Sequence, residues 1–116
     1  METPILLHNP RCSKSREALA LLEARGVAFE VAEYLKAPPT KAFVADLLTR
    51  LDVEPRALMR TGEPRYAELG LDDAGLGREE LIAALVANPA LLQRPILLAN
   101  GKAAIGRPPE AILSIL

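Results

Sequence analysis

The first third of the chain contains two short apolar stretches separated by a helical pattern. Residues 5–7 are all apolar and are typical of a buried strand. From Ser13 to Arg25 apolar residues recur on one side at helical spacing, and Gly26 is expected to end this helix, because glycine takes the left-handed cap conformation cheaply. Residues 29–34 alternate in polarity and predict a second strand. A strand, a helix and a strand in this order indicate a βαβ unit with parallel strands.

The remainder predicts a helical middle followed by a hairpin. Thr40 is a good N-cap for a helix whose apolar residues share one side: Phe43, Val44, Leu47, Leu48 and Leu51. Residues 54–77 are irregular and predict one or two short helical turns, and a further helix is expected from Arg78 to the stop at Asn88-Pro89. Residues 96–99 and 102–105 predict strands joined at Asn100-Gly101, the strongest short hairpin signal. Pro109 suits the first turn of a closing helix that runs to Leu116.

This order of elements predicts an α/β fold of the thioredoxin-like kind. It has a βαβ half, then a half made of a β-hairpin and a helix, with a helical insertion between the two halves. At 116 residues the chain fits one domain, residues 1–116, which can bury roughly two-thirds of the surface of its unfolded form.

Composition excludes several classes of function. A formal net charge of −1 and an aromatic content of 3% argue against a protein that wraps nucleic acid, stacks on its bases or coats an anionic membrane. We find neither an apolar run near the length of a membrane span nor a signal segment at the N-terminus. The single cysteine cannot form an internal disulfide. We therefore expect a cytoplasmic protein that binds neither nucleic acid nor membrane.

Cys12 lies between the first predicted strand and the first predicted helix. The unpaired N–H groups and the dipole at the start of a helix favour a thiolate. A free cysteine is more often a small buried hydrophobe. Here its neighbours are polar or charged and argue against a core segment: His8, Arg11, Ser13, Lys14, Ser15 and Arg16. We therefore interpret Cys12 as a reactive thiol surrounded by positive charge.

Ser15 and His8 each allow two interpretations. Ser15 stands three residues after Cys12, where a dithiol oxidoreductase would place its second cysteine, so an external thiol such as glutathione or a partner protein would have to release any adduct of Cys12. Ser15 is equally compatible with an ordinary serine that satisfies a backbone donor in the first helical turn. His8 is either a structural residue or a charge partner of the thiolate, and its place four residues before Cys12 favours the second.

Arginine outnumbers lysine ten to four. A GC-rich genome alone can produce this bias, but the planar fork of arginine also suits the binding of oxyanions. Arg60, Arg94 and Arg107 come from different segments. In a thioredoxin-like fold the proline that opens the third strand, here Pro95, lies beside the catalytic loop, commonly after a cis peptide bond, so Arg94 is expected near Cys12. Each of these arginines alone is more often a surface charge, whereas three that converge on a thiolate would form an oxyanion pocket.

The segment from His8 to Arg16 resembles the signature of the glutaredoxin-dependent arsenate reductase family. The resemblance continues in order over essentially the whole chain, through Tyr34-Leu35, Pro38-Pro39, Arg56-Ala57-Leu58-Met59-Arg60, Tyr66-Ala67-Glu68-Leu69-Gly70-Leu71, Asn88-Pro89, Gln93-Arg94-Pro95-Ile96 and Gly106-Arg107-Pro108. With Ser13-Lys14 after Cys12 and an end at Leu116, the chain looks closest to a short chromosomal branch, ArsC-like, of this family.

The resemblance implies the roles of the site residues. Cys12 would attack arsenate, and Arg60, Arg94 and Arg107 would bind the oxyanion. The supporting residues would be His8, Ser15 and Arg16, with Pro95 as a structural residue near the site. Glutathione would be a co-substrate and glutaredoxin a partner protein, with no bound cofactor and no metal.

We therefore expect reduction of arsenate to arsenite, and two other functions remain open. One is a glutathione-linked monothiol oxidoreductase that acts on another oxyanion or on protein disulfides. The other is a regulator that binds RNA polymerase, as do some members of the same superfamily. The three arginines argue against the regulator, because a polymerase-binding module needs no oxyanion pocket.

Overall fold

The computed structural model describes residues 3–116, which form two compact units. The described part of Met1–Ala37 and the segment Arg94–Leu116 form one unit, here called the sheet unit. Pro38–Gln93 forms the other, here called the insertion unit. The sheet unit is therefore built from both ends of the chain, which confirms the predicted α/β arrangement of two halves with a helical insertion between them. That residues 1–116 form a single domain stays a prediction.

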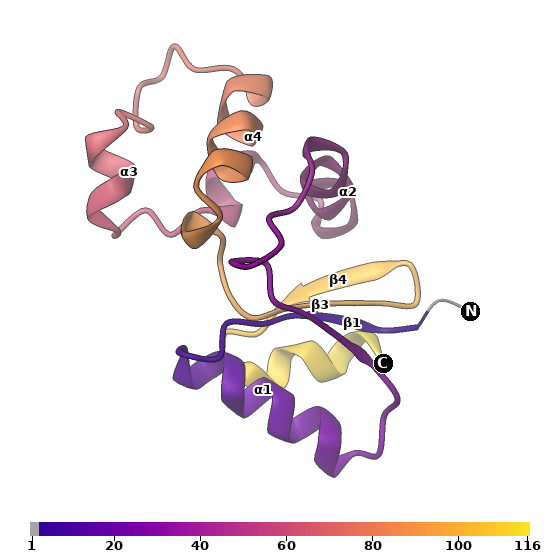
Figure 1. The fold of residues 1–116 in the computed structure, drawn as a ribbon. Coiled ribbons are helices and arrows are strands. Elements are labelled where there is room, and N and C mark those ends of the chain that lie inside the picture. Colours follow the sequence, from indigo (N-terminus) through magenta and orange to yellow (C-terminus); the bar gives the residue numbers. More distant parts are fainter. Residues whose placement is uncertain (1–2) are drawn as a thin grey trace. The chain divides into compact units, whose positions relative to one another are not determined.

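The sheet unit contains a four-stranded mixed sheet with the strand order β2-β1-β3-β4 (Figure 1). The strands are β1 (Ile5–Leu7), β2 (Glu30–Ala32), β3 (Ile96–Ala99) and β4 (Lys102–Ile105). β1 and β2 are parallel, with Leu6 opposite Val31, whereas β1 pairs with β3 and β3 with β4 in antiparallel fashion. The parallel β1–β2 pair confirms the βαβ unit. All four residues of β3 are buried, as expected for an apolar run in a central strand.

The helix α1 (Ser13–Ala24) and the 3₁₀ helix η3 (Pro109–Ile115) lie on the same face of this sheet (Figure 1). Their buried residues pack with those of β1 and β3 into one core: Leu6, Ala18, Leu22, Leu97, Ala99 and Ile112. The predicted closing helix is present and is of the 3₁₀ type. An apolar pattern over so few residues does not separate a helix with i to i+3 hydrogen bonds from an α-helix.

β2 is shorter than predicted, because the chain turns at Glu33. The carbonyl oxygen of Glu33 accepts the N–H groups of Lys36 and Ala37, at 3.0 and 3.1 Å. The alternation of polar and apolar residues thus continues beyond the end of the strand into a turn. This turn buries Tyr34, which is 2% exposed.

The two turn predictions of the sheet unit are confirmed. Asn100 and Gly101 connect β3 to β4 with φ angles of 54° and 75°. A two-residue hairpin turn with both central residues at positive φ is of type I′, which Asn-Gly favours. Gly26 follows α1 at φ 67° and is the expected left-handed terminator.

The regular elements of the insertion unit are all helices or helical turns. These are α2 (Lys41–Leu51), the 3₁₀ turn η1 (Pro55–Leu58), α3 (Pro64–Glu68), α4 (Arg78–Ala87) and the 3₁₀ turn η2 (Pro89–Leu91). Thr40 caps α2 as predicted, since its Oγ1 accepts the N–H of Phe43 at 3.1 Å. Leu47, Leu48 and Leu85 are buried here. No helix within residues 3–116 is long and apolar enough to cross a membrane.

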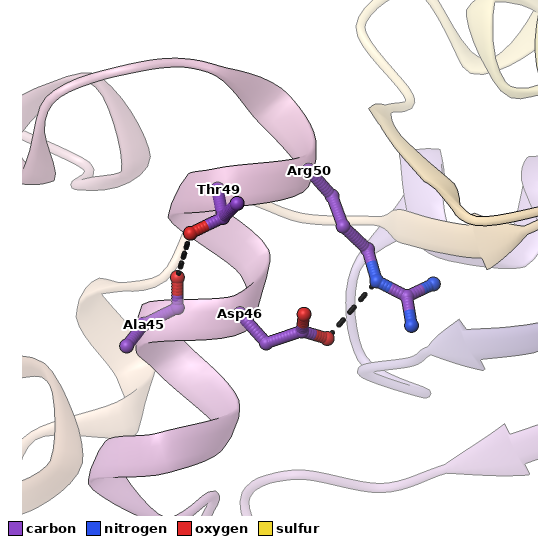
Figure 2. A network of polar contacts seen from close by, with 4 residues as sticks. All are labelled: Ala45, Asp46, Thr49 and Arg50. Atoms are coloured by element: carbon purple, nitrogen blue, oxygen red, sulfur yellow. Dashed lines mark hydrogen bonds and ion pairs between the residues drawn. The ribbon is translucent and has the colours of Figure 1, made fainter.

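The exposed side of α2 carries polar contacts that follow helical spacing. Arg50 Nε donates to Asp46 Oδ2 at 2.9 Å, and Thr49 Oγ1 donates to the carbonyl oxygen of Ala45 at 3.1 Å (Figure 2). Residues four apart are neighbours on a helix surface, where an ion pair such as Arg50–Asp46 adds a few tenths of a kcal/mol.

Gly106 follows β4 at a point where the backbone approaches Pro95. Its N–H donates to the carbonyl oxygen of Pro95 at 2.8 Å. A Cβ at this position would lie 2.6 Å from Pro95 Cγ and 3.2 Å from Ile112 Cγ2. We expect Gly106→Ala to lower the free energy of unfolding by about 1–3 kcal/mol, as for other overpacked sites. Urea unfolding checks this, with Gly62→Ala as a control, since nothing lies within 4 Å of that added methyl group. An equal loss of unfolding free energy in both variants would contradict the close approach of Gly106 to Pro95.

Candidate functional site

Cys12 ends the loop that follows β1 and is the N-cap residue of α1. The loop, residues 8–12, is held by Asn9, whose carbonyl oxygen accepts the N–H of Cys12 at 3.0 Å. Asn9 Oδ1 accepts the N–H of Arg11 at the same distance. From the exposed side, Arg16 donates to the carbonyl oxygen of Pro10 at 2.9 Å. These contacts fix Cys12 at the start of the helix, with 9% of its surface exposed.

Ser15 connects the two ends of this loop from inside. Its side chain is fully buried, its Oγ lies 2.6 Å from His8 Nδ1, and it accepts the N–H of Asn9 at 3.0 Å. The hydroxyl oxygen has two lone pairs, so the bond to His8 runs in the direction set by the ring tautomer: Oγ donates when Nε2 carries the proton and accepts when Nδ1 does. Ser15 therefore satisfies a backbone donor, which is one of its two predicted roles. The donor is the N–H of Asn9 in the loop and not a group of the first helical turn.

His8 is buried and neutral rather than cationic. Burial lowers the pKa of its imidazole below the usual 6.5, the charge of Glu33 partly opposes this, and the charge of Arg16 adds to the lowering. The interpretation of His8 as a positive partner of the thiolate is therefore not supported by these surroundings. The structural interpretation fits, because the side chains of His8 and Ser15 form a buried hydrogen bond with one another.

This burial makes a prediction about pH. A folded pKa below 6.5 means that the unfolded chain takes up the proton of His8 more readily, so the free energy of unfolding falls as the pH decreases through about 6.5. His8 is the only histidine in the sequence, so one ring signal in an NMR titration reports its pKa directly. His8→Gln serves as the control in urea unfolding and should flatten the decrease between about pH 7.5 and 5.5. A midpoint above 6.5 would rule out the neutral, buried ring.

Arg94 is the cation next to the Cys12 sulfur. Burial alone would raise the pKa of the Cys12 thiol, but hydrogen bonding and charge from Arg94, together with the N–H groups of Ser15 and Lys14 at the start of α1, outweigh it, so the pKa is lowered. Burial likewise lowers the pKa of Arg94, whereas Cys12 and Tyr34 raise it, and the net direction is upward. A charged guanidinium beside a stabilised thiolate suits nucleophilic attack on an anion that needs positive charge to approach.

Two further features concern the donors of Arg94 and Arg107. Nε of Arg94 is buried and has no hydrogen-bond partner among the described residues. Arg107 is exposed, and its Nε donates to the carbonyl oxygen of Arg94 at 3.0 Å. The structure thus places Arg94 beside Cys12, and Arg107 against the backbone of Arg94, within the sheet unit. Pro95 is buried between Arg94 and β3, and the Arg94–Pro95 peptide bond is cis, as the thioredoxin-like arrangement implied.

The third predicted arginine, Arg60, lies in the insertion unit. Its side chain pairs with Glu63, and its N–H donates to the carbonyl oxygen of Leu91 at 2.7 Å. Its role in oxyanion binding stays a prediction. Within residues 3–116 no group of three His, Cys, Asp or Glu side chains is placed to hold a metal ion.

Sequence reasoning missed Asn9 and Tyr34. Asn9 shapes the loop through its side chain and both of its backbone groups. The residue type was a usable signal, because asparagine commonly accepts the N–H two residues on. Tyr34 lies beside Arg94 and favours its charged form. Nothing local in the sequence places Tyr34 next to Arg94, since the two residues are far apart along the chain.

Comparison with known proteins agrees with this geometry. Residues 7–115 match the model of the ArsC family. The chain is 51% identical over 112 residues to a Neisseria meningitidis protein named arsenate reductase, covering 96% of each chain, and 54% identical over 112 residues to the uncharacterized protein YfgD of Escherichia coli, covering 96% and 94%. A solved arsenate reductase from Vibrio cholerae is 46% identical, covers 98% of each chain and superimposes with a TM-score of 0.96. The chain therefore belongs to the ArsC family.

Proposed function

We propose that this protein reduces arsenate to arsenite through Cys12, with glutathione and glutaredoxin as the external reductants. The observation that carries the proposal is the pairing of Cys12 with Arg94 at the start of α1, where the pKa of the thiol is lowered. A related Neisseria protein named arsenate reductase shares half of its residues with this chain.

The first step forms a covalent bond between sulfur and arsenic. The Cys12 thiolate attacks arsenate, and one arsenate oxygen leaves as water after it takes up protons. Arg94 and Arg107 bind the remaining oxygens, and the buried Nε of Arg94 offers a donor without a protein acceptor within residues 3–116. Donors aimed at developing negative charge commonly provide the largest part of catalysis. By family resemblance we assign the third arginine of oxyanion binding to Arg60.

The next steps supply two electrons from two thiols. Glutathione condenses with the arsenic and releases a second water, so the arsenic carries both Cys12 and glutathione sulfurs. A thiolate of glutaredoxin then attacks the glutathione sulfur, the electrons of that sulfur–arsenic bond pass to arsenic, and As(V) becomes As(III). The mixed disulfide of glutaredoxin and glutathione leaves, and water releases arsenite and regenerates Cys12. We place this reaction in the cytoplasm, because glutathione keeps thiols reduced there.

External thiols are necessary in this scheme because Cys12 is the only cysteine of the chain. We expect NADPH consumption with arsenate only when glutathione, glutaredoxin and glutathione reductase are all present. Thioredoxin with its reductase should substitute poorly, because it resolves disulfides but supplies no glutathione to the arsenic adduct.

The coupled assay has two outcomes that would contradict this scheme. Full activity with thioredoxin alone would overturn the proposed reductants while leaving arsenate as the substrate. Glutathionylation of Cys12 without any turnover of arsenate would favour a monothiol oxidoreductase that acts on other substrates.

A further inference from the structure

A cavity of about 470 Å³ lies beside the Cys12 loop, entirely within the sheet unit. The loop contributes His8, Pro10 and Arg11 to its walls, and the turn after β2 contributes Glu33, Leu35 and Lys36. Its volume falls in the range of about 300–1,000 Å³ that is typical of small-molecule sites.

The side chains of the cavity carry two positive charges and one negative charge. Arg11 and Lys36 are exposed cations, and Glu33 is a half-buried carboxylate that pairs with Lys36 at 3.4 Å. An exposed ion pair of this kind contributes little, so both groups are available to a ligand at small cost. Leu35, 43% exposed, and Pro10 add apolar surface.

We propose that this cavity binds glutathione in the position from which it serves Cys12, an inference that rests on the proposed function. Glutathione carries two carboxylates and one ammonium group, with its thiol between them. Arg11 and Lys36 match the two carboxylates, and Glu33 matches the ammonium group. Pro10 and Leu35 offer contacts to the aliphatic part of the γ-glutamyl chain.

The position of the cavity along the chain supports this assignment. Arg11 immediately precedes Cys12, and Asn9 Oδ1 holds the backbone of Arg11. A ligand anchored at Arg11 by one carboxylate therefore binds against the loop that ends at Cys12.

A second cavity in the sheet unit does not have matching charges. It lies between α1 and η3 with a volume of about 630 Å³, and its charged residues are Lys14, Glu17 and Glu110. With two carboxylates and one cation, this cavity has a net negative charge, which would repel the two carboxylates of glutathione. Charge thus distinguishes the cavity beside the loop from this one.

S-methylglutathione tests the assignment, because its blocked thiol cannot react with Cys12. We expect its titration into the full chain, followed by NMR, to shift the amide signals of Arg11, Glu33 and Lys36 to saturation. Lys36→Glu should weaken binding about tenfold, because reversal replaces an attraction by a repulsion. Lys102→Glu is the matched control, since Lys102 is exposed on β4 and lines neither cavity.

Equal affinity in Lys36→Glu and wild type, shifts confined to other residues, or no saturable binding would overturn the assignment. The test is independent of arsenate. Binding at this cavity without arsenate reduction would reject the proposed function and keep the site. Arsenate reduction with the same KM for glutathione in Lys36→Glu and wild type would reject the site and keep the proposed function.

Discussion

Cys12→Ser is expected to abolish arsenate reduction without destabilising the fold. A serine hydroxyl does not ionise near neutral pH and so cannot replace the thiolate that Arg94 and the start of α1 stabilise. At the same position serine is a preferred N-cap residue, whose short hydroxyl accepts a helix N–H at ordinary hydrogen-bond distance. The variant should therefore gain up to about 1 kcal/mol in the free energy of unfolding.

The measurement combines the coupled NADPH assay with urea unfolding. Ser15→Ala is the comparison, because it keeps the thiol but leaves His8 Nδ1 and the N–H of Asn9 without their partner in the loop. We expect that variant to lose stability and only part of its activity. Residual turnover in Cys12→Ser close to that of wild type would exclude Cys12 as the nucleophile.

Arg94→Lys is expected to lower kcat/KM for arsenate about 100-fold, in the range found when one donor to a developing oxyanion is removed. Lysine keeps the positive charge but loses the planar fork that binds two oxygens together. The carbonyl oxygen of residue 94, which accepts Arg107 Nε, remains in the variant, so stability should change little. Arg25→Lys, an exposed position after α1, is the matched control.

Titration of the thiol separates charge from geometry at this position. By ultraviolet absorbance of the thiolate, Arg94→Ala should raise the pKa of Cys12, because the charge and hydrogen bonding of Arg94 both lower it. Arg94→Lys should raise it less, because the charge remains. Wild-type turnover in Arg94→Lys would contradict oxyanion binding by the arginine fork.

The elements that could be predicted from the sequence are those whose signals are local. Asn100-Gly101, Thr40 and Gly26 each determine a backbone conformation through their own chemistry, and the structure has the expected turn, cap and helix end at these places. The end of β2 could not be predicted, since the alternation of residues 29–34 is shared by a strand and by the turn at Glu33.

The residues of the site also differ in whether the sequence alone predicts their role. Cys12 could be recognised because the start of a helix is visible in the sequence, and the nearness of Arg94 followed from the thioredoxin-like arrangement. The state of His8 could not be predicted, because its pKa depends on burial, which arises only in the folded chain. Asn9 and Tyr34 act through contacts that no spacing rule identifies.

The construction of the sheet unit from both ends of the chain has a consequence for synthesis on the ribosome. β1 needs β3, with Leu7 opposite Ile96, before the sheet can close, and the loop entropy of that closure includes the whole intervening segment. Arg94 emerges only after the insertion unit has been made. A nascent chain that already carries Cys12 therefore lacks the cation that lowers the pKa of its thiol. The nucleophile gains its cation only when the last fifth of the protein has joined the first, so truncated chains are not reactive in the manner of the finished one.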